Sequence, residues 1–476
     1  MNSEQSLYVV FVYLLMMLLH DGFALTDSGR ASLIETLRGA DPEQRRERLR
    51  NLQLVDFVTS PPGTSKNSDE NAVIEKNTAS IPEGGSIIEK NRLAGISDYL
   101  YEGDINLTEE QLAALESKLS NGTTRPKRQA SKLFPIWTNK TVFYYYNESF
   151  VPPMRALVNK TLFYLSARTC LTFVEDATAT NRVRVIEGDG CYSSVGMIGG
   201  EQDLSLGCGT LTIIAHEFMH ALGIFHMHSR YDRDSFITVD LTNVTAADQP
   251  NYNKLTTDES VNYTPYEYGS VMHYDAKAYA TSGVSMIPVY PRYLRTMGSH
   301  MVSFYDISMI NYHYKCNAIC ATKGANCVNG GMRNPKNCNI CICPAGYGGA
   351  LCSLRPAGCG AVLTAAATWK ERKVVLGEAT NTDIRDPYSL CNDWIQAPAG
   401  KRVQLQVTKM NGVFCLNGCW TQGIEFKTLP NKLNTNPRIC CPEQLKQVIT
   451  SNINPTPVIN YNNLRQSIIT YLYRYI

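Results

Sequence analysis

The sequence predicts an α+β domain in the middle of the chain, followed by a small disulfide-rich module and a β-sandwich domain. Its 476 residues are enough for about three domains of ~150 residues each. The sixteen cysteines are spread unevenly, since none precedes Cys170 and most lie at or beyond Cys316. Strand-like stretches precede a helical stretch at about 210–222 in the cysteine-poor middle. The middle therefore has its own core, whereas disulfides support the C-terminal part.

Charge and cysteine content narrow the class of protein. The net charge is only +2 at pH 7, which gives no electrostatic case for binding nucleic acid or an acidic membrane surface. An even number of cysteines indicates an oxidising compartment and a disulfide framework. We therefore expect a secreted, extracellular protein.

Residues 1–24 are typical of a secretory signal peptide. The apolar run Leu7–Leu19 is shorter than the ~20 residues of a spanning helix, and small residues precede a cut after Ala24. Glu4 and the lack of Lys or Arg before the run leave a signal anchor as the alternative. No later segment is apolar enough to span a bilayer, so we expect no membrane span in the mature chain.

Residues 25–128 are polar, free of cysteine and helical in pattern. Thr108 and Gln111 form the pattern of a capping box. The stretch ends in Arg-Pro-Lys-Arg at Arg128, which matches the processing site of a furin-like protease. A solvated basic linker is the alternative interpretation. The position before the predicted catalytic domain favours a propeptide that is removed by cleavage after Arg128.

Residues 129–316 predict the α+β domain. Strands are expected at 141–146, 170–174 and 182–186, and a helix at 152–167 with proline in its first turn. With the helix at 210–222, these elements predict a mixed sheet with helices beside a cleft, in two lobes.

The helix at 210–222 carries the pattern H-E-x-x-H-x-x-G-x-x-H. His216 and His220 lie four residues apart and share one helix face. Gly223 allows the helix to stop, so that His226 can return as a third ligand. Three imidazoles with an open fourth position predict one catalytic zinc ion, with Glu217 as general base. The alternative, a helix with buried histidines, does not explain the full spacing.

A second motif follows downstream, Ser-Val-Met-His-Tyr at 270–274. Together with Arg-Tyr-Asp-Arg-Asp at 230–234, it resembles the astacins, zinc endopeptidases among the metzincins. The resemblance implies a metzincin fold with Met272 in a turn beneath the metal. It also implies that Tyr274 coordinates the resting zinc and steadies the transition state.

The resemblance extends to latency and to substrate binding. Tyr-Glu-Gly-Asp at 101–104 resembles the astacin propeptide motif, in which Asp104 would be the inhibitory zinc ligand; a surface turn is the alternative. The stretch 191–194 matches the edge strand that binds extended substrate, although a covered edge is also possible. The family disulfides would be Cys170–Cys316 and Cys191–Cys208, where sequence alone allows three pairings.

Two departures from the astacin pattern concern anchoring and specificity. Met227 stands where astacins usually have a glutamate that anchors the mature N-terminus, so this anchoring is in doubt. The stretch 296–300 also differs from the family pattern, so the pocket preference for the residue after the scissile bond does not carry over.

Residues 317–353 resemble an EGF-like module, and residues 359–476 resemble a CUB domain. The six cysteines of the EGF-like module replace a core too small to hold it together, and we expect no calcium there. The CUB domain would dock substrates or partners, or pack passively on the protease. The pairing of Cys415, Cys419, Cys440 and Cys441 is left open. The resemblances imply the disulfides Cys320–Cys338, Cys327–Cys341, Cys343–Cys352 and Cys359–Cys391.

Seven N-x-S/T sequons predict surface asparagines that carry glycans. They are Asn106, Asn121, Asn139, Asn147, Asn159, Asn243 and Asn262.

The sequence thus predicts a secreted zinc endopeptidase that is made as a zymogen. By resemblance to nematode astacins, its substrates would be extracellular proteins, such as cuticle or matrix proteins in moulting, hatching or tissue penetration. A catalytically silent adhesion protein with EGF-like and CUB modules is the alternative.

Overall fold

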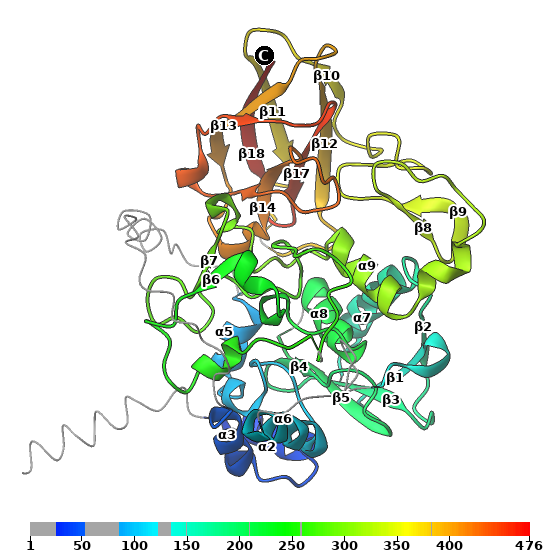
Figure 1. Cartoon of the computed structure of the whole chain (residues 1–476), viewed down its shortest axis with the longest axis vertical. Coiled ribbons are helices and arrows are strands. Elements are labelled where there is room, and N and C mark those ends of the chain that lie inside the picture. Colours follow the sequence, from blue (N-terminus) through cyan, green and yellow to red (C-terminus); the bar gives the residue numbers. More distant parts are fainter. Residues whose placement is uncertain are drawn as a thin grey trace, which may run out of the picture.

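The computed structural model describes residues 25–52, 85–121 and 135–476, except positions 149, 209, 258 and 382. The predicted signal peptide and the processing site at Arg128 lie outside these residues. Within them, no helix is long and apolar enough to cross a membrane. In Figure 1 most of the N-terminal helices lie at the bottom, the central domain in the middle and the C-terminal sandwich at the top.

The central domain is built on a five-stranded mixed sheet with the order β2-β1-β3-β5-β4. Four strands run parallel, and only the edge strand β4 runs antiparallel to β5. In β3, Val183 and Val185 point into the core and alternate with arginines, as the sequence pattern predicts. The strands are β1 (Thr141–Tyr146), β2 (Thr172–Glu175), β3 (Arg182–Ile186), β4 (Cys191–Ser193) and β5 (Glu201–Leu206).

Three helices accompany this sheet in the described part of the domain, and the expected α+β arrangement of a mixed sheet with helices is confirmed. The helices are α7 (Pro152–Ser166), α8 (Leu211–Ala221) and α9 (Phe304–His313). Buried residues of α7, α8 and the sheet share one hydrophobic core. Ser303 and Asp306 form a capping box that starts α9.

The C-terminal end of α8 is fixed by aromatic side chains. Gly223 has φ +93°, a conformation that glycine adopts without steric cost, and ends the helix. The indole of Trp137 donates to the carbonyl of Ala221 at 2.8 Å, and the hydroxyl of Tyr314 donates to that of Leu222 at 3.1 Å. These bonds satisfy carbonyls that the helix leaves free, and they hold the turn that leads to His226.

The second lobe, roughly 227–300, is mostly irregular and has its own core rich in tyrosine. Its only strand pair among the described residues joins β6 (Ile237–Val239) to β7 (Met286–Pro288). Short 3-10 helices occur here and elsewhere, at Ser97–Tyr99, Thr138–Lys140, Met227–Ser229, Arg233–Ser235, Gln249–Tyr252, Pro291–Tyr293, Cys316–Cys320, Asn417–Cys419 and Pro442–Gln444.

The described residues before the central domain form four α-helices, which are α2 (Asp27–Thr36), α3 (Pro42–Arg50), α5 (Ile87–Leu93) and α6 (Glu109–Asn121). In Figure 1, α2, α3 and α6 lie below the domain and α5 lies beside it. The buried guanidinium of Arg45 fixes them by donating to the carbonyl oxygens of Tyr99 and Leu107 and to the side chains of Asn106 and Glu109. The predicted capping box of Thr108 and Gln111 is formed, and it starts the last of these helices, α6.

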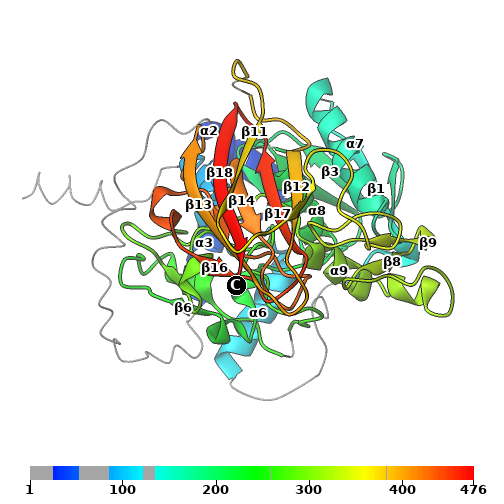
Figure 2. The same ribbon diagram turned by 90° about the horizontal axis from the view of Figure 1, so that it is seen from above.

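The C-terminal part contains a small disulfide-rich module and a two-sheet sandwich, as expected. The module has one hairpin, β8 (Met332–Asn334) with β9 (Asn337–Ile342). The sandwich stacks the sheets β10-β12-β17-β14-β15 and β11-β18-β13-β16, and Figure 2 shows them from above. Its strands are β10 (Val362–Thr364), β11 (Lys370–Leu376), β12 (Ser389–Gln396), β13 (Val403–Asn411), β14 (Gln422–Phe426), β15 (Arg438–Ile439), β16 (Ile449–Thr450), β17 (Thr456–Asn462) and β18 (Ser467–Tyr475).

Eight disulfides join all sixteen cysteines. Six have the pairing that the sequence motifs imply, which are Cys170–Cys316, Cys191–Cys208, Cys320–Cys338, Cys327–Cys341, Cys343–Cys352 and Cys359–Cys391. The pairing that the sequence left open is Cys415–Cys441 and Cys419–Cys440. The adjacent residues Cys440 and Cys441 therefore both bond to the segment 415–419.

Candidate metal centre

The structure brings His216, His220 and His226 together at the end of α8. The Nε2 atom of His216 lies 3.0 Å from that of His220 and 3.3 Å from that of His226. All three rings are buried. Asp104 of the N-terminal segment enters the same cluster, with one carboxylate oxygen 3.2 Å from Nε2 of both His216 and His226.

The opposite ring nitrogens have hydrogen-bond acceptors that orient the rings. Nδ1 of His216 donates to the carbonyl of Val271 at 2.8 Å, and Nδ1 of His220 donates to that of Ile224 at 2.8 Å. Nδ1 of His226 donates to the carboxylate of Glu102 at 2.6 Å. These bonds place the proton on Nδ1 and leave each Nε2 lone pair free for a metal.

This donor set fits a zinc ion. Ligands at ~2.0–2.1 Å from a tetrahedral zinc lie about 3.3 Å from one another, close to the distances between the histidine nitrogens. Three neutral imidazoles and one carboxylate are ligands that zinc commonly takes. The three histidines, with Asp104 in the fourth place, can therefore hold zinc.

Glu217 lies beside this cluster and is fully buried. Both of its carboxylate oxygens lack a hydrogen-bond partner among the residues that the structure describes. Burial raises the pKa of Glu217 well above its ordinary value, and the charge of Asp104 adds to this. A buried carboxylate without a partner is costly, so it indicates a group that acts on a water or a substrate.

The turn at 270–274 lies directly behind the histidines. Met272 is buried, and its carbonyl accepts from the backbone N–H of Met227 at 2.8 Å. The ring of Tyr274 stacks on His228 with ring centroids 3.7 Å apart and lies 4.8 Å from His226. Its hydroxyl donates to the backbone carbonyl of Glu102, so the N-terminal segment also holds this tyrosine.

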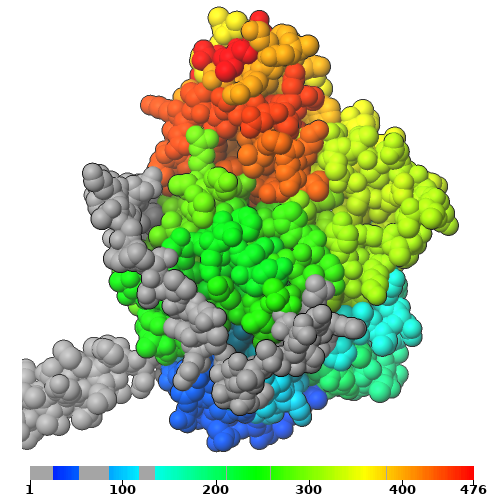
Figure 3. Space-filling model, in the orientation of Figure 1, coloured from blue at the N-terminus to red at the C-terminus, as the bar shows by residue number. Residues whose placement is uncertain are grey.

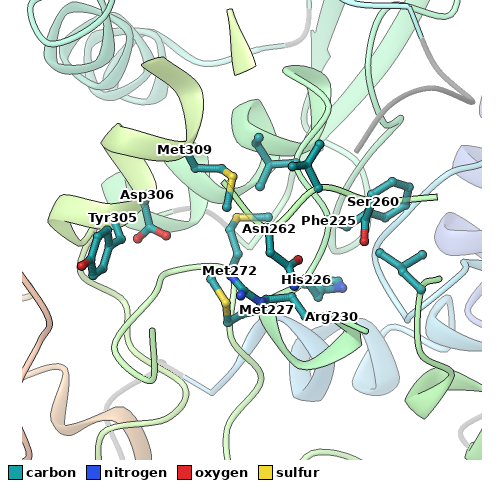
Figure 4. Close-up of a pocket in the computed structure, with 13 residues that line it drawn as sticks. Phe225, His226, Met227, Arg230, Ser260, Asn262, Met272, Tyr305, Asp306 and Met309 are labelled. Carbon is teal, nitrogen blue, oxygen red and sulfur yellow. The ribbon is translucent and has the colours of Figure 1, made fainter. Parts of the chain in front are cut away.

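Met227 lines an apolar pocket behind the metal cluster. Figure 4 shows its side chain near those of Met272 and Met309, with Asp306 and Tyr305 on one side of the pocket. A thioether carries no charge, so Met227 does not anchor an amino terminus through an ion pair. The carboxylate of Asp306, at the side of this pocket, accepts a hydrogen bond from the hydroxyl of Ser270 at 2.5 Å.

The N-terminal segment covers the edge strand β4. The backbone N–H of Ser193 donates to the carbonyl of Asp104 at 3.0 Å, and that of Asn106 donates to the carbonyl of Ser193 at 2.9 Å. Ile105 pairs with Ser193 in the parallel direction. The edge that the sequence assigned to substrate is therefore covered here by residues 104–106.

Three further residues belong to the site, although sequence patterns did not single them out. Glu102 joins His226 to the hydroxyl of Ser229, at 2.6 and 2.7 Å. Asn91 bonds to both backbone groups of Cys191. The sequence signal for Glu102 is its place in the stretch Tyr-Glu-Gly-Asp at 101–104, whereas nothing in the sequence points to Asn91 or to the buried Glu267.

The sequons occupy different environments. Asn106 is only 8% exposed, which contradicts the expected surface position. Asn139, Asn159 and Asn243 are exposed and Asn147 is half-buried. The amide nitrogen of Asn262 is buried beside the apolar pocket. The side chain of Asn121 lies outside the described residues.

The mixed sheet, the three histidines with Glu217 and the methionine turn together define a zinc-dependent peptidase of the metzincin class. A model of the astacin family of peptidases matches residues 129–315. Zinc metalloproteinase nas-32 of Caenorhabditis elegans is 39% identical over 452 residues, covering 92% of this chain and 68% of its own length. The chain belongs to the astacin family and is a zinc endopeptidase.

Two further relatives and one solved structure are also similar to this chain. Zinc metalloproteinase nas-17 of C. elegans is 40% identical, with 80% of this chain and 87% of its own length covered. For nas-31, the chain spans 64% of the relative's length at 39% identity. A solved hatching-enzyme zinc protease of medaka, high choriolytic enzyme 1, is 30% identical over 40% of this chain and 99% of its own, with a TM-score of 0.36.

Proposed function

We propose that the chain is a secreted endopeptidase that is made as a zymogen and becomes active when residues 25–128 are removed after Arg128. The observation that carries the proposal is the Asp104 carboxylate, which lies among the Nε2 atoms of the three histidines. A carboxylate there takes the ligand position that an attacking water needs. The uncut chain is then inactive.

Coverage of the cleft edge supports the same proposal. Residues 104–106 use the backbone groups of Ser193, which an extended peptide would need for docking. Glu102 contacts His226 and Tyr274 with its side chain and its backbone carbonyl. The segment thus blocks the ligand position, the edge strand and the tyrosine at once.

The residues around the histidines suggest how a peptide bond is hydrolysed. Bound zinc supplies a Lewis acid that polarises a carbonyl and lowers the pKa of a water molecule. Glu217 takes a proton from the attacking water and later gives it to the leaving amine. The hydroxyl of Tyr274, once released from Glu102, donates a hydrogen bond to the oxyanion. Burial of the site strengthens each of these interactions.

We infer that the substrates are extracellular proteins, and that cuticle or matrix proteins are candidates. The support is the relatives' nematode source and the eight disulfides, which suit an oxidising compartment. Six disulfides and two β-rich modules follow the catalytic domain and would survive outside the cell.

One experiment tests the peptidase activity and the latency together. The full chain and its Arg128→Ala variant are treated with a furin-like protease and then incubated with a proteome-derived peptide library, with and without chelator. We expect chelator-sensitive cleavage only by the cut wild type. Cleavage by the uncut variant would refute latency. A cut, zinc-loaded wild type without activity would favour the catalytically silent adhesion protein.

A further inference from the structure

The C-terminal sandwich is docked directly onto the lobe that carries the methionine turn. Figure 3 shows the sandwich resting on this lobe, on the face that the view presents. Arg438 donates from its backbone to the hydroxyl of Thr296 at 2.9 Å and from its guanidinium to that of Ser299 at 2.6 Å. The rings of His300 and Trp420 stack 4.4 Å apart. The stretch 296–300, which departs from the family pattern, therefore contacts the sandwich.

One contact of this interface reaches the base of the methionine turn. Glu267 is 1% exposed and precedes the turn by three residues. Its carboxylate accepts the backbone N–H of Gly269 at 2.9 Å and, from the sandwich, the backbone N–H of Thr435 at 3.0 Å. The hydroxyl of Tyr293 also donates to the carbonyl of Thr435, at 3.1 Å. Both backbone groups of Thr435 are thus bound by the catalytic lobe.

From Glu267 a short chain of bonds leads to a metal ligand. The backbone N–H of Ser270 donates to the carbonyl of Glu267 at 3.2 Å. The hydroxyl of Ser270 accepts from the backbone N–H of Met272 at 3.0 Å. Between them, the carbonyl of Val271 accepts from Nδ1 of His216 at 2.8 Å. A displaced turn would therefore misdirect the ring of His216.

The loop that presents Thr435 is itself held firmly inside the sandwich. The backbone N–H of Asn436 donates to the carboxylate of Glu425 at 2.8 Å, and the ammonium of Lys427 donates to the carbonyl of Asn434. The side-chain oxygen of Asn436 accepts the backbone N–H of Thr428 at 2.9 Å. All these residues except Asn434 are buried. The loop around Thr435 is therefore rigid enough to fix the position of the turn at 270–274.

We propose that the sandwich is a working part of the metal centre: Thr435 and Glu267 position the methionine turn, so that Val271 orients His216. Glu267 is then a positioning residue, since it acts through the turn and touches neither metal nor substrate. Mutation of a residue that hydrogen-bonds a ligating histidine typically lowers metal affinity or activity by about 10- to 100-fold. The proposal goes beyond the proposed function, and only its kinetic readout rests on that function.

The close approach of Gly269 to Thr435 allows a test by clash and relief. A Cβ atom on Gly269 would lie 2.6 Å from Cβ, Cγ2 and Oγ1 of Thr435, which is too close for real contacts. Gly269→Ala should push the loop and the turn apart. Thr435→Gly removes all three opposing atoms and keeps the backbone N–H. The double variant should therefore regain the original contact.

Two readouts are measured on each variant. The first is zinc release to a chromogenic chelator from the zinc-loaded full chain, which needs no peptidase activity. The second is peptide hydrolysis after cleavage at Arg128. For Gly269→Ala we expect zinc release to be faster and kcat lower, each by about tenfold, with KM changed by less than about twofold. Adding Thr435→Gly to Gly269→Ala should bring both readouts back toward the wild type, because the opposing atoms are gone.

Glu443→Gln is the matched control, because it removes the charge of the ion pair with Arg295, 2.7 Å long, at the same interface. Zinc release by this control should equal that of the wild type. Unchanged zinc release in Gly269→Ala, or a double variant as impaired as Gly269→Ala, would overturn the proposal. If Gly269→Ala does not fold, Glu425→Gln decides, since it loosens the loop from the sandwich side. Equal release by Glu425→Gln and Glu443→Gln would then also overturn it.

Discussion

The side-chain amide of Asn91 pairs with both backbone groups of Cys191, donating to its carbonyl at 2.6 Å and accepting its N–H at 2.8 Å. The same amide donates to the carbonyl of Gly103 at 2.8 Å. A primary amide has the same donor and acceptor as a peptide group, so Asn91 imitates a strand against the end of β4. Together with residues 104–106, it satisfies the whole exposed edge of this strand.

Replacing Asn91 by leucine should weaken the hold of the N-terminal segment. The change leaves the backbone N–H and the carbonyl of Cys191 buried without partners, at a cost of about 1–3 kcal/mol each. The variant is made together with Arg128→Ala, which keeps the chain uncut. We expect its peptide hydrolysis to exceed that of Arg128→Ala alone. Asn51→Leu, at an exposed position, is the control and should stay inactive. If Asn91→Leu shows no peptide hydrolysis, the contact of Asn91 with β4 adds nothing to latency.

Asp104→Asn should abolish latency in the same uncut background. A neutral amide is a much weaker zinc ligand than a carboxylate, so the fourth position becomes open to water. We expect activity toward a fluorogenic peptide to approach that of the cleaved wild type. Asp27→Asn, an exposed acid in the same segment, should leave the chain inactive. Equal inactivity of both variants would contradict the role of Asp104.

Glu217→Gln should remove proton transfer without removing the metal. We expect kcat of the cleaved enzyme to fall by about 10²- to 10⁴-fold, which is the usual contribution of general acid–base catalysis. Zinc content, measured by mass spectrometry of the metal, should stay at one ion per chain because the three histidines are untouched. Glu175→Gln, on the exposed face of β2, serves as control. Near-normal kcat in Glu217→Gln would refute the proposed mechanism.

Glu267 predicts a pH dependence of stability. Burial raises the pKa of Glu267 from 4.5 to about 7; the charge of Asp306 adds to this, and the N–H groups of Thr435 and Gly269 and the charge of Lys427 oppose it. Since the folded pKa is the higher one, the stabilisation is complete below pH 4.5 and is lost as the pH rises to about 7. The loss amounts to up to about 3 kcal/mol.

The measurement compares the wild type with Glu267→Gln, which does not titrate. We expect the wild type to lose stability relative to the variant between pH 4.5 and 7, in urea unfolding of the full chain. Above pH 7 the difference should stay constant. Parallel stability curves over the whole range would show that this carboxyl does not change its ionisation on folding.

Glycan occupancy should follow burial rather than the sequon pattern alone. Asn106 is buried and its side-chain oxygen accepts from Arg45 at 3.2 Å, so a glycan there conflicts with the packing of the segment. We expect mass spectrometry of the chain, expressed through a secretory pathway, to find glycans at Asn139 and Asn243, which are exposed, and none at Asn106. A glycan at Asn106 in folded, latent material would contradict this packing.

Local patterns predicted much of the fold because local geometry determines it. The spacing of His216 and His220 follows from the helical repeat, and the alternation along β3 follows from the pleat of a strand. The strand at 170–174 was placed too early, since β2 begins at Thr172. Boundaries of this kind depend on the neighbouring strand, which sequence periodicity does not show.

The contacts that complete the site could not be predicted in this way. Asn91 and Cys191 are 100 residues apart, Glu102 and His226 are 124 apart, and Glu267 and Thr435 are 168 apart. Each joins a polar side chain to a segment that only the folded chain brings near. A buried asparagine or glutamate looks like any surface residue in the sequence, because composition and spacing carry no sign of its partner.

The seam between the sandwich and the catalytic lobe also limits how evolution and engineering can recombine these parts. Thr435 sits against Gly269 so closely that a methyl group on the glycine would collide with it. A chimaera with a sandwich domain taken from another protein would therefore need matching residues on both sides of this contact. The modules follow one another along the chain, but one of them cannot be exchanged without adjusting the domain it contacts.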